Sequence, residues 1–324
     1  MLLLTAILQH ARLGKENLIL AVEEPEQNLE PINQRLVTRS LLSMHAGAAQ
    51  LLLSTHSPDL AGSVPLRALH LVRDFPGGPD VRPLRSVAPA EHKFFERHAR
   101  GAIVDGLYAD AVLLVEGPTE RGALPVLWAA HRPGQGLDEE RIELVDSESI
   151  DSMPPYVRFF RALDIPVAAL CDSDKRKACQ KITDANPDLM VRWHTHRDWE
   201  GVLSTEASVE AVARALEDCR ASLGDWADHE HDLRNCIRST AGDPGHLASA
   251  QDIWALLAGY QQAGQRAALA ALLRGGSGLD FKSTIYARQI AQALPDVPPT
   301  VAAMIELVHR FVVGDAQARG VHDL

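Results

Sequence analysis

Short apolar runs that end at Gly, Pro or acidic residues recur along this chain. Residues 111–115 read Ala-Val-Leu-Leu-Val before Glu116, and residues 166–171 read Pro-Val-Ala-Ala-Leu-Cys before Asp172. Such runs predict buried strands of a parallel sheet. Further strands are predicted at residues 18–22, 50–54, 69–72, 142–145 and 190–194.

Helical patterns separate the predicted strands. Helices are expected at residues 30–45, 90–105, 119–131, 154–163, 199–217, 283–294 and 299–313. The alternation predicts an α/β fold in which helices flank a parallel sheet. Residues 207–273 carry no strand signal and are rich in Ala, Leu and Gln, which favours a helical subdomain.

Composition narrows the class of protein. The 324 residues favour about two domains, and a hydrophobic content of 46% is enough for buried cores. The net charge of −11 argues against binding nucleic acid by bulk charge alone, but it does not exclude a nuclease with local basic groups. No apolar run is long enough to cross a membrane and no secretion signal is evident, so a cytoplasmic location is expected. The cysteines lack CxxC spacing and are expected to be reduced: Cys171, Cys179, Cys219 and Cys236.

A first acidic motif follows the strand predicted at residues 18–22. The sequence continues with Glu23, Glu24, Pro25 and Glu26, and a later strand at 50–54 leads to His56. These segments resemble the Walker B strand and the switch histidine of ABC-type ATPases. The resemblance gives Glu23 a role in supporting magnesium and Glu24 a role in orienting the attacking water.

The phosphate-binding part of such an ATPase is absent from this sequence. No GxxxxGK[ST] motif occurs, and this motif supplies the backbone N–H groups and the lysine that surround the phosphates. We therefore expect the chain to begin inside an ATPase domain and to hydrolyse no ATP itself, with ATP acting only in a longer protein.

Two acidic motifs follow the strands at 111–115 and 166–171. The first holds Glu116 and Glu120, and the second holds Asp172 and Asp174. Carboxylates gathered beyond the carboxyl ends of parallel strands repel one another and favour a hard cation such as Mg²⁺ or Mn²⁺. Together the motifs resemble the Toprim domain. A Walker B block followed by Toprim resembles the layout of the OLD (overcoming lysogenization defect) family of nucleases.

The resemblance implies a set of site residues. Two ions are expected, and Glu116, Glu120, Asp172, Asp174 and Lys282 are the expected catalytic groups. Glu200, Asp146 and Ser147 are further candidate ligands, although capping of the next helix is the favoured role for Asp146 and Ser147. Lys175, Arg176 and Lys177 could contact phosphates or simply form a solvated helix face. His194 and His196 are spaced for a metal, but a structural role is favoured for them.

The expected organisation has five parts. Residues 1–75 are the end of an ABC-type ATPase domain, 76–106 a linker, 107–206 the Toprim core, 207–275 a helical subdomain and 276–324 helices that return to the core. The expected function is a Mg²⁺- or Mn²⁺-dependent DNA endonuclease that works as a homodimer. An RNA-processing or primase-like Toprim protein and a non-catalytic assembly subunit remain alternatives.

Overall fold

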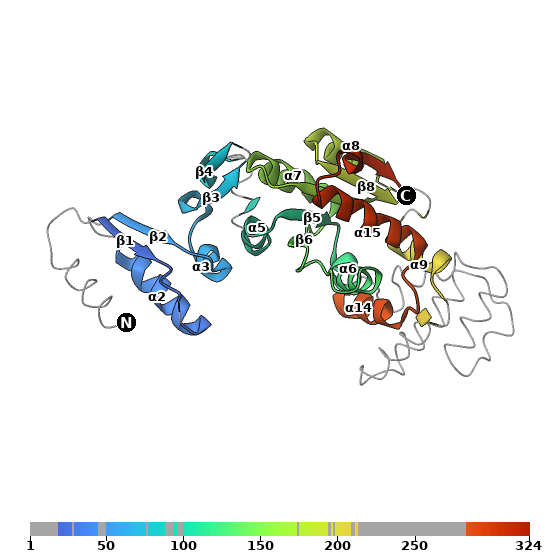
Figure 1. Ribbon diagram of the computed structural model, residues 1–324, viewed down its shortest axis with the longest axis horizontal. Coiled ribbons are helices and arrows are strands. Elements are labelled where there is room, and N and C mark those ends of the chain that lie inside the picture. Colours follow the sequence, from blue (N-terminus) through green and yellow to red (C-terminus); the bar gives the residue numbers. More distant parts are fainter. Residues whose placement is uncertain are drawn as a thin grey trace. The chain divides into compact units, whose positions relative to one another are not determined.

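The computed structural model divides the chain into two compact units, Met1–Tyr108 and Ala109–Leu324 (Figure 1). The structure describes residues 19–27, 29–44, 50–75, 77–87, 94–95, 100–173, 175–193, 196, 198–208, 211–212 and 283–324. Within these ranges no helix combines the length and the apolar character that crossing a bilayer requires.

The first unit contains a pair of parallel strands covered by one helix. Strand β1 (Ile19–Glu23) pairs in register with β2 (Gln50–Ser54). Alternate residues of both strands, among them Leu20 and Leu53, pack against Val37 of α2 (Pro31–Met44). This period-two pattern is that of a sheet buried on one face.

The rest of the first unit occupies part of the stretch that was expected to be a linker. Helix α3 (Pro58–Ser63) leads to an antiparallel hairpin of β3 (His70–Phe75) and β4 (Gly78–Pro83). The turn that the sequence indicated at residues 75–80 is the hairpin connection. Helix α5 (Arg100–Leu107) then packs against α3. Residues 76–106 therefore include β4 and α5.

The second unit is built on a parallel sheet whose described strands run in the order β6-β5-β7-β8-β9. These strands are β5 (Ala111–Val115), β6 (Ile142–Asp146), β7 (Val167–Asp172), β8 (Leu189–Trp193) and β9 (Gly320–Asp323). Every neighbouring pair is parallel. The predicted α/β class is confirmed, but β9 was not among the predicted strands.

Helices cover both faces of this sheet (Figure 1). Helices α7 (Met153–Ala162) and α8 (Arg176–Ala185) lie on one face, and α8 was not predicted as an element of its own. The opposite face is covered by α6 (Pro118–His131), α9 (Trp199–Glu206), α14 (Thr284–Ala293) and α15 (Pro299–Val312). The core on that side joins the sheet to these helices through Leu113, Leu170, Val191, Leu124 and Ile305.

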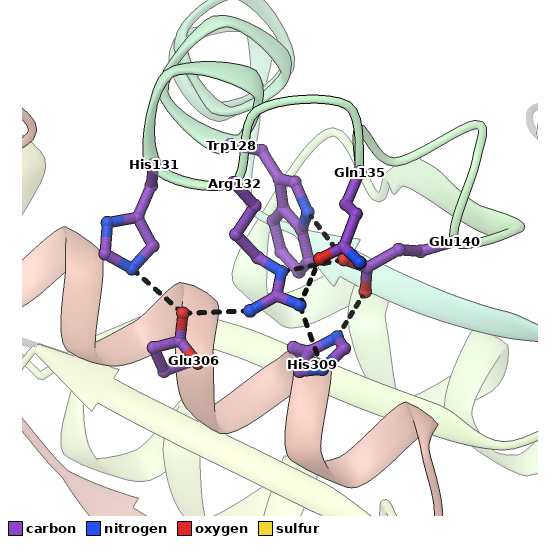
Figure 2. Close-up of polar contacts among 7 residues, drawn as sticks. All are labelled: Trp128, His131, Arg132, Gln135, Glu140, Glu306 and His309. Carbon is purple, nitrogen blue, oxygen red and sulfur yellow. Dashed lines mark hydrogen bonds and ion pairs between the residues drawn. The ribbon is translucent and has the colours of Figure 1, made fainter.

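Helix α6 is fixed along its length by the segments that come last in the chain. At Gly122 the backbone of α14 approaches so closely that an added Cβ would lie 2.2 Å from the Thr284 carbonyl oxygen. At the end of α6, the Arg132 guanidinium binds Glu140 at 2.9 Å and Glu306 of α15 at 3.0 Å (Figure 2). His309 also binds Glu140, at 2.8 Å. This network joins α6 to α15 and thereby orients the other end of α6, where the acidic site lies.

Candidate metal centre at the carboxyl edge of the sheet

Strand register brings acidic residues to one edge of the sheet. Val115 of β5 pairs with Asp146 of β6, so Glu116 directly follows the strand end beside Asp146. On the other side of β5, strand β7 ends at Asp172. Because all three strands are parallel, their carboxyl ends meet at the same edge, as the sequence pattern predicted.

Glu120 reaches this edge from the first turn of α6. The helix begins at Pro118, and the Gly117 backbone N–H donates to Glu120 Oε2 at 3.2 Å. The residue is buried, with 5% of its surface exposed. Burial raises the pKa of Glu120 to about 8, and the charges of Glu116 and Glu200 add to the rise, whereas backbone N–H groups oppose it. A carboxylate placed there needs a positive partner when it is ionised.

Asp172 is affected by burial and by the same acidic side chains. Burial raises its pKa to about 9, and the charges of Glu120, Glu116, Glu200 and Asp198 contribute in that order. Asp172 Oδ1 and Glu116 Oε2 are both buried and have no hydrogen-bond partner. Two unpaired carboxylate oxygens beside mutually repelling acids suit a hard divalent cation, so the residues fit the metal that a Toprim site implies.

Lys175 contacts this cluster of acids. Its Nζ lies 2.7 Å from Glu116 Oε1. Within the described ranges, no group of three or more His, Cys, Asp and Glu side chains is arranged to hold a metal ion. The acids lie close enough to shift one another's pKa, while Glu116 is paired with Lys175 rather than with a second carboxylate. The metal ligands therefore stay a prediction.

Asp146 and Ser147 have local roles at the end of β6. Asp146 Oδ1 accepts from the Glu148 backbone N–H at 2.7 Å, which is a local turn and not the helix cap that the sequence favoured, because the N-caps of the next helices are Ser149 and Ser152. Ser147 is buried, and its hydroxyl faces the Val115 carbonyl oxygen at 2.8 Å, which ties β6 to β5 beneath Glu116. Burial raises the pKa of Asp146, and the nearby positive charge of Arg121 opposes that rise.

The start of α9 adds acids from the other side of β7. Asp198 caps the helix by accepting from the Gly201 N–H at 2.8 Å, and Glu200 is buried in the first turn with 6% exposed. Trp193, the β8 neighbour of Asp172, stacks edge-on against Trp199 at a centroid distance of 5.3 Å. Both tryptophans are buried and form a mainly apolar wall beside these acids, in which their indole Nε1 atoms have no hydrogen-bond partner.

Several predicted residues lie outside the described residues. These are Asp174, Lys282, His194, Cys219 and Cys236. Arg176 and Lys177 are exposed at the start of α8. His196 pairs with Glu206 at 2.8 Å, in keeping with a structural role. Cys171 and Cys179 are buried free thiols.

The first unit brings its own acidic residues to a strand end. Glu23 closes β1, and Glu24 adopts a positive φ of 40° and lies 3.5 Å from His56 Nε2. Glu26, which the sequence did not single out, accepts hydrogen bonds from Thr55 and from the His56 backbone N–H at 3.0 Å. The position of Glu26 in the turn directly after Glu23, Glu24 and Pro25 was the sequence feature that could have identified it. The predicted Walker B and switch-histidine elements are therefore neighbours.

Sequential strand-end acids on a parallel sheet define a Toprim-like fold, and comparison with known proteins agrees. Residues 107–174 match the family "Overcoming lysogenization defect protein-like, TOPRIM domain". Residues 1–61 match an AAA domain family named for the AbiEii toxin of a type IV TA system. The resemblance to the OLD family is confirmed: residues 107–174 are similar to an OLD-like Toprim domain, and residues 1–61 are similar to an AAA domain.

Individual relatives cover different shares of the chain. The Old nuclease of Escherichia phage P2 is 27% identical over 169 residues, which are 49% of this chain and 28% of that protein. The chain thus spans 28% of the length of this relative. The C-terminal region of the Xanthomonas campestris pv. campestris OLD protein has 21% identity and a TM-score of 0.35, covering 64% of this chain and 96% of that one. The equivalent region from Burkholderia pseudomallei has 15% identity and a TM-score of 0.36, covering 63% and 99%.

Proposed function

We propose that this chain is a metal-dependent endonuclease that hydrolyses phosphodiester bonds of DNA at the carboxyl edge of the second unit. The observation that carries the proposal is the pair of buried, unpaired oxygens, Glu116 Oε2 and Asp172 Oδ1, within a cluster of acids. Glu116, Glu120 and Asp172 would hold divalent ions, with Asp174 and Glu200 as further ligands. Bound Mg²⁺ or Mn²⁺ ions supply an activated water and neutralise charge on the phosphate and the leaving oxygen.

The chain's own groups have separate tasks in this proposal. Glu120, held by the Gly117 N–H, fixes the start of α6 against the edge of the sheet. Asp172 is held at the strand end by pairing of β7 with β8. The wall of Trp193 and Trp199 excludes water beside the acids, which strengthens every electrostatic interaction there. Lys282 is proposed to lie near the phosphate, as the family resemblance implies.

The OLD-family relatives support this assignment. The matched relative is itself named a nuclease, and the matching family model covers both Glu116 and Asp172. The likeness of residues 1–61 to an AAA domain supports a role for ATP alongside this nuclease. A homodimer remains part of the proposal.

Cleavage of supercoiled plasmid tests the proposal directly. The chain is incubated with plasmid in Mg²⁺, Mn²⁺, Ca²⁺ or EDTA, beside Asp172→Asn and a control, Asp138→Asn. Asp138 is exposed and precedes β6 at the opposite edge of the sheet. We expect nicking and linearisation in Mg²⁺ or Mn²⁺, full activity of the control, and a loss of at least about 100-fold in Asp172→Asn. Equal cleavage by both variants would refute the proposed role of Asp172 in the cleavage site. A preference for RNA over DNA would show that the substrate is RNA.

A further inference from the structure

The proposed site and its nucleic-acid substrate are both negatively charged, so they repel each other. Glu116, Glu120, Asp146, Asp172 and Glu200 are all acidic, and a nucleic acid adds one negative charge per phosphate. Bound metal ions offset this repulsion at the scissile phosphate alone. The neighbouring phosphates need positive groups of the protein.

Two basic side chains flank the acids, one on each side of β5. Arg121 follows Glu120 in the first turns of α6, is exposed, and acts electrostatically on Asp146 at the end of β6. Lys175 follows the end of β7 and pairs with Glu116 at 2.7 Å. Arg121 was not among the residues that the sequence motifs indicated.

The strand order sets the distance between the ends of β6 and β7, near which these two groups lie. Strand β5 lies between β6 and β7, so the ends of β6 and β7 are two strand spacings apart. Neighbouring strands are about 4.8 Å apart, which makes the separation about 10 Å. That length equals the rise of about three stacked nucleotides at about 3.4 Å each.

We propose that Arg121 and Lys175 form a phosphate clamp that holds the substrate strand across the carboxyl edge, from the β6 side to the β7 side. This inference rests on the proposed nuclease function. Arg121 binds a phosphate on one side of the scissile bond. Lys175 releases Glu116 and binds a phosphate on the other side. The clamp reads the backbone and not the bases, so it sets the path of the strand without sequence preference.

The salt dependence of DNA binding tests the clamp without any need for cleavage. Binding of a fluorescent duplex oligonucleotide is measured by anisotropy in CaCl₂ across a series of NaCl concentrations. Each lost phosphate contact lowers the slope of log K against log salt by about 0.9. We expect this reduction in Arg121→Ala, partial recovery in Arg121→Lys, and no change in the control Arg310→Ala. Arg310 is exposed in the last turn of α15, where it binds Asp315.

Plasmid cleavage separates failure of the clamp from failure of the function. In Mg²⁺ we expect Arg121→Ala to raise KM at least about tenfold and to change kcat less, because the residue positions the substrate strand. An unchanged salt slope in Arg121→Ala, with wild-type protein that cleaves DNA, overturns the clamp and leaves the nuclease standing. Wild-type protein that neither binds nor cleaves DNA overturns both.

Discussion

Replacing Glu120 by Gln should stabilise the metal-free protein while removing a proposed metal ligand. The folded state holds the pKa of Glu120 at about 8, mainly through burial, against about 4.3 for an exposed glutamate. Between these values the unfolded chain releases a proton that the folded chain retains. The free energy of unfolding therefore falls as the pH rises from about 4.3 to about 8.

The size of the effect follows from the same two values. A difference of about 3.7 units at about 1.4 kcal/mol each gives about 5 kcal/mol, fully developed above pH 8. The Gln side-chain oxygen can still accept from the Gly117 N–H, but its buried amide donors cost about 1–2 kcal/mol when they lack acceptors. Removing the charge of Glu120 also lowers the pKa of Asp172, so the two titrations are coupled. We expect Glu120→Gln to gain about 2–4 kcal/mol at pH 8 and almost nothing at pH 5.

Urea denaturation in EDTA at several pH values measures this difference. All five tryptophans of the sequence lie between residues 109 and 324, so their fluorescence follows unfolding of the second unit alone. Glu139→Gln, at an exposed position in the loop before β6, is the matched control and should change stability by less than about 0.5 kcal/mol. A wild-type stability that does not fall between pH 5 and 8, or a Glu120→Gln variant no more stable than wild type at pH 8, would refute the reasoning.

Three further changes probe the site and its support. Mg²⁺ should raise the wild-type urea midpoint more at pH 8 than at pH 6, because metal binding must displace the protons held by the acids; a pH-independent increase contradicts this. Arg132→Met should cost about 2–4 kcal/mol of unfolding free energy in urea, because it leaves the largely buried Glu140 carboxylate without its guanidinium, and a loss below about 1 kcal/mol would show that the network is dispensable. Gly122→Ala should lower Tm by several degrees because its Cβ meets the Thr284 carbonyl, whereas Gly62→Ala, with open space at its Cβ, should not.

The strands that carry the acids could be predicted because their signal is local. Residues 111–115 were predicted as a strand and form β5, and the run before Asp172 forms β7 one residue later at each end. Both are buried on both faces by helices, so the sequence is apolar throughout and stops abruptly at the polar edge. The abrupt end of each apolar run was the reason for predicting that Glu116 and Asp172 lie at this edge of the sheet.

Two strands with weak local signals escaped prediction. Strand β9 contains Gly320, Val321, His322 and Asp323, a sequence with little strand character, and it forms because it pairs with β8 and because Asp323 binds Arg192. Strand β4 begins with Gly78 and Pro79 and was interpreted as a turn. In both cases pairing with a neighbouring strand of the sheet outweighs local propensity, across a hairpin for β4 and over a long chain separation for β9.

The interactions of the site were partly beyond sequence reasoning as well. The spacing of Glu116 and Glu120 predicted that both reach one edge, but not that Lys175 pairs with Glu116 or that Arg121 lies near Asp146. These contacts depend on the order β6-β5-β7, which the chain order of the strands does not reveal. Asp198 and Trp193 likewise join the site only through the pairing of β7 with β8.

The anchoring of α6 by α14 and α15 has a consequence for the order of folding. Strands β5 to β8 and their connecting helices are formed by neighbours in sequence, whereas α6 meets Thr284 and Glu306 only after more than about 150 further residues have been made. Closing so long a loop is slow relative to forming the local βα units. We therefore expect the sheet to form first and Glu120 to reach its final position last. A nascent chain would then carry the strand-end acids well before it could assemble the proposed cleavage centre.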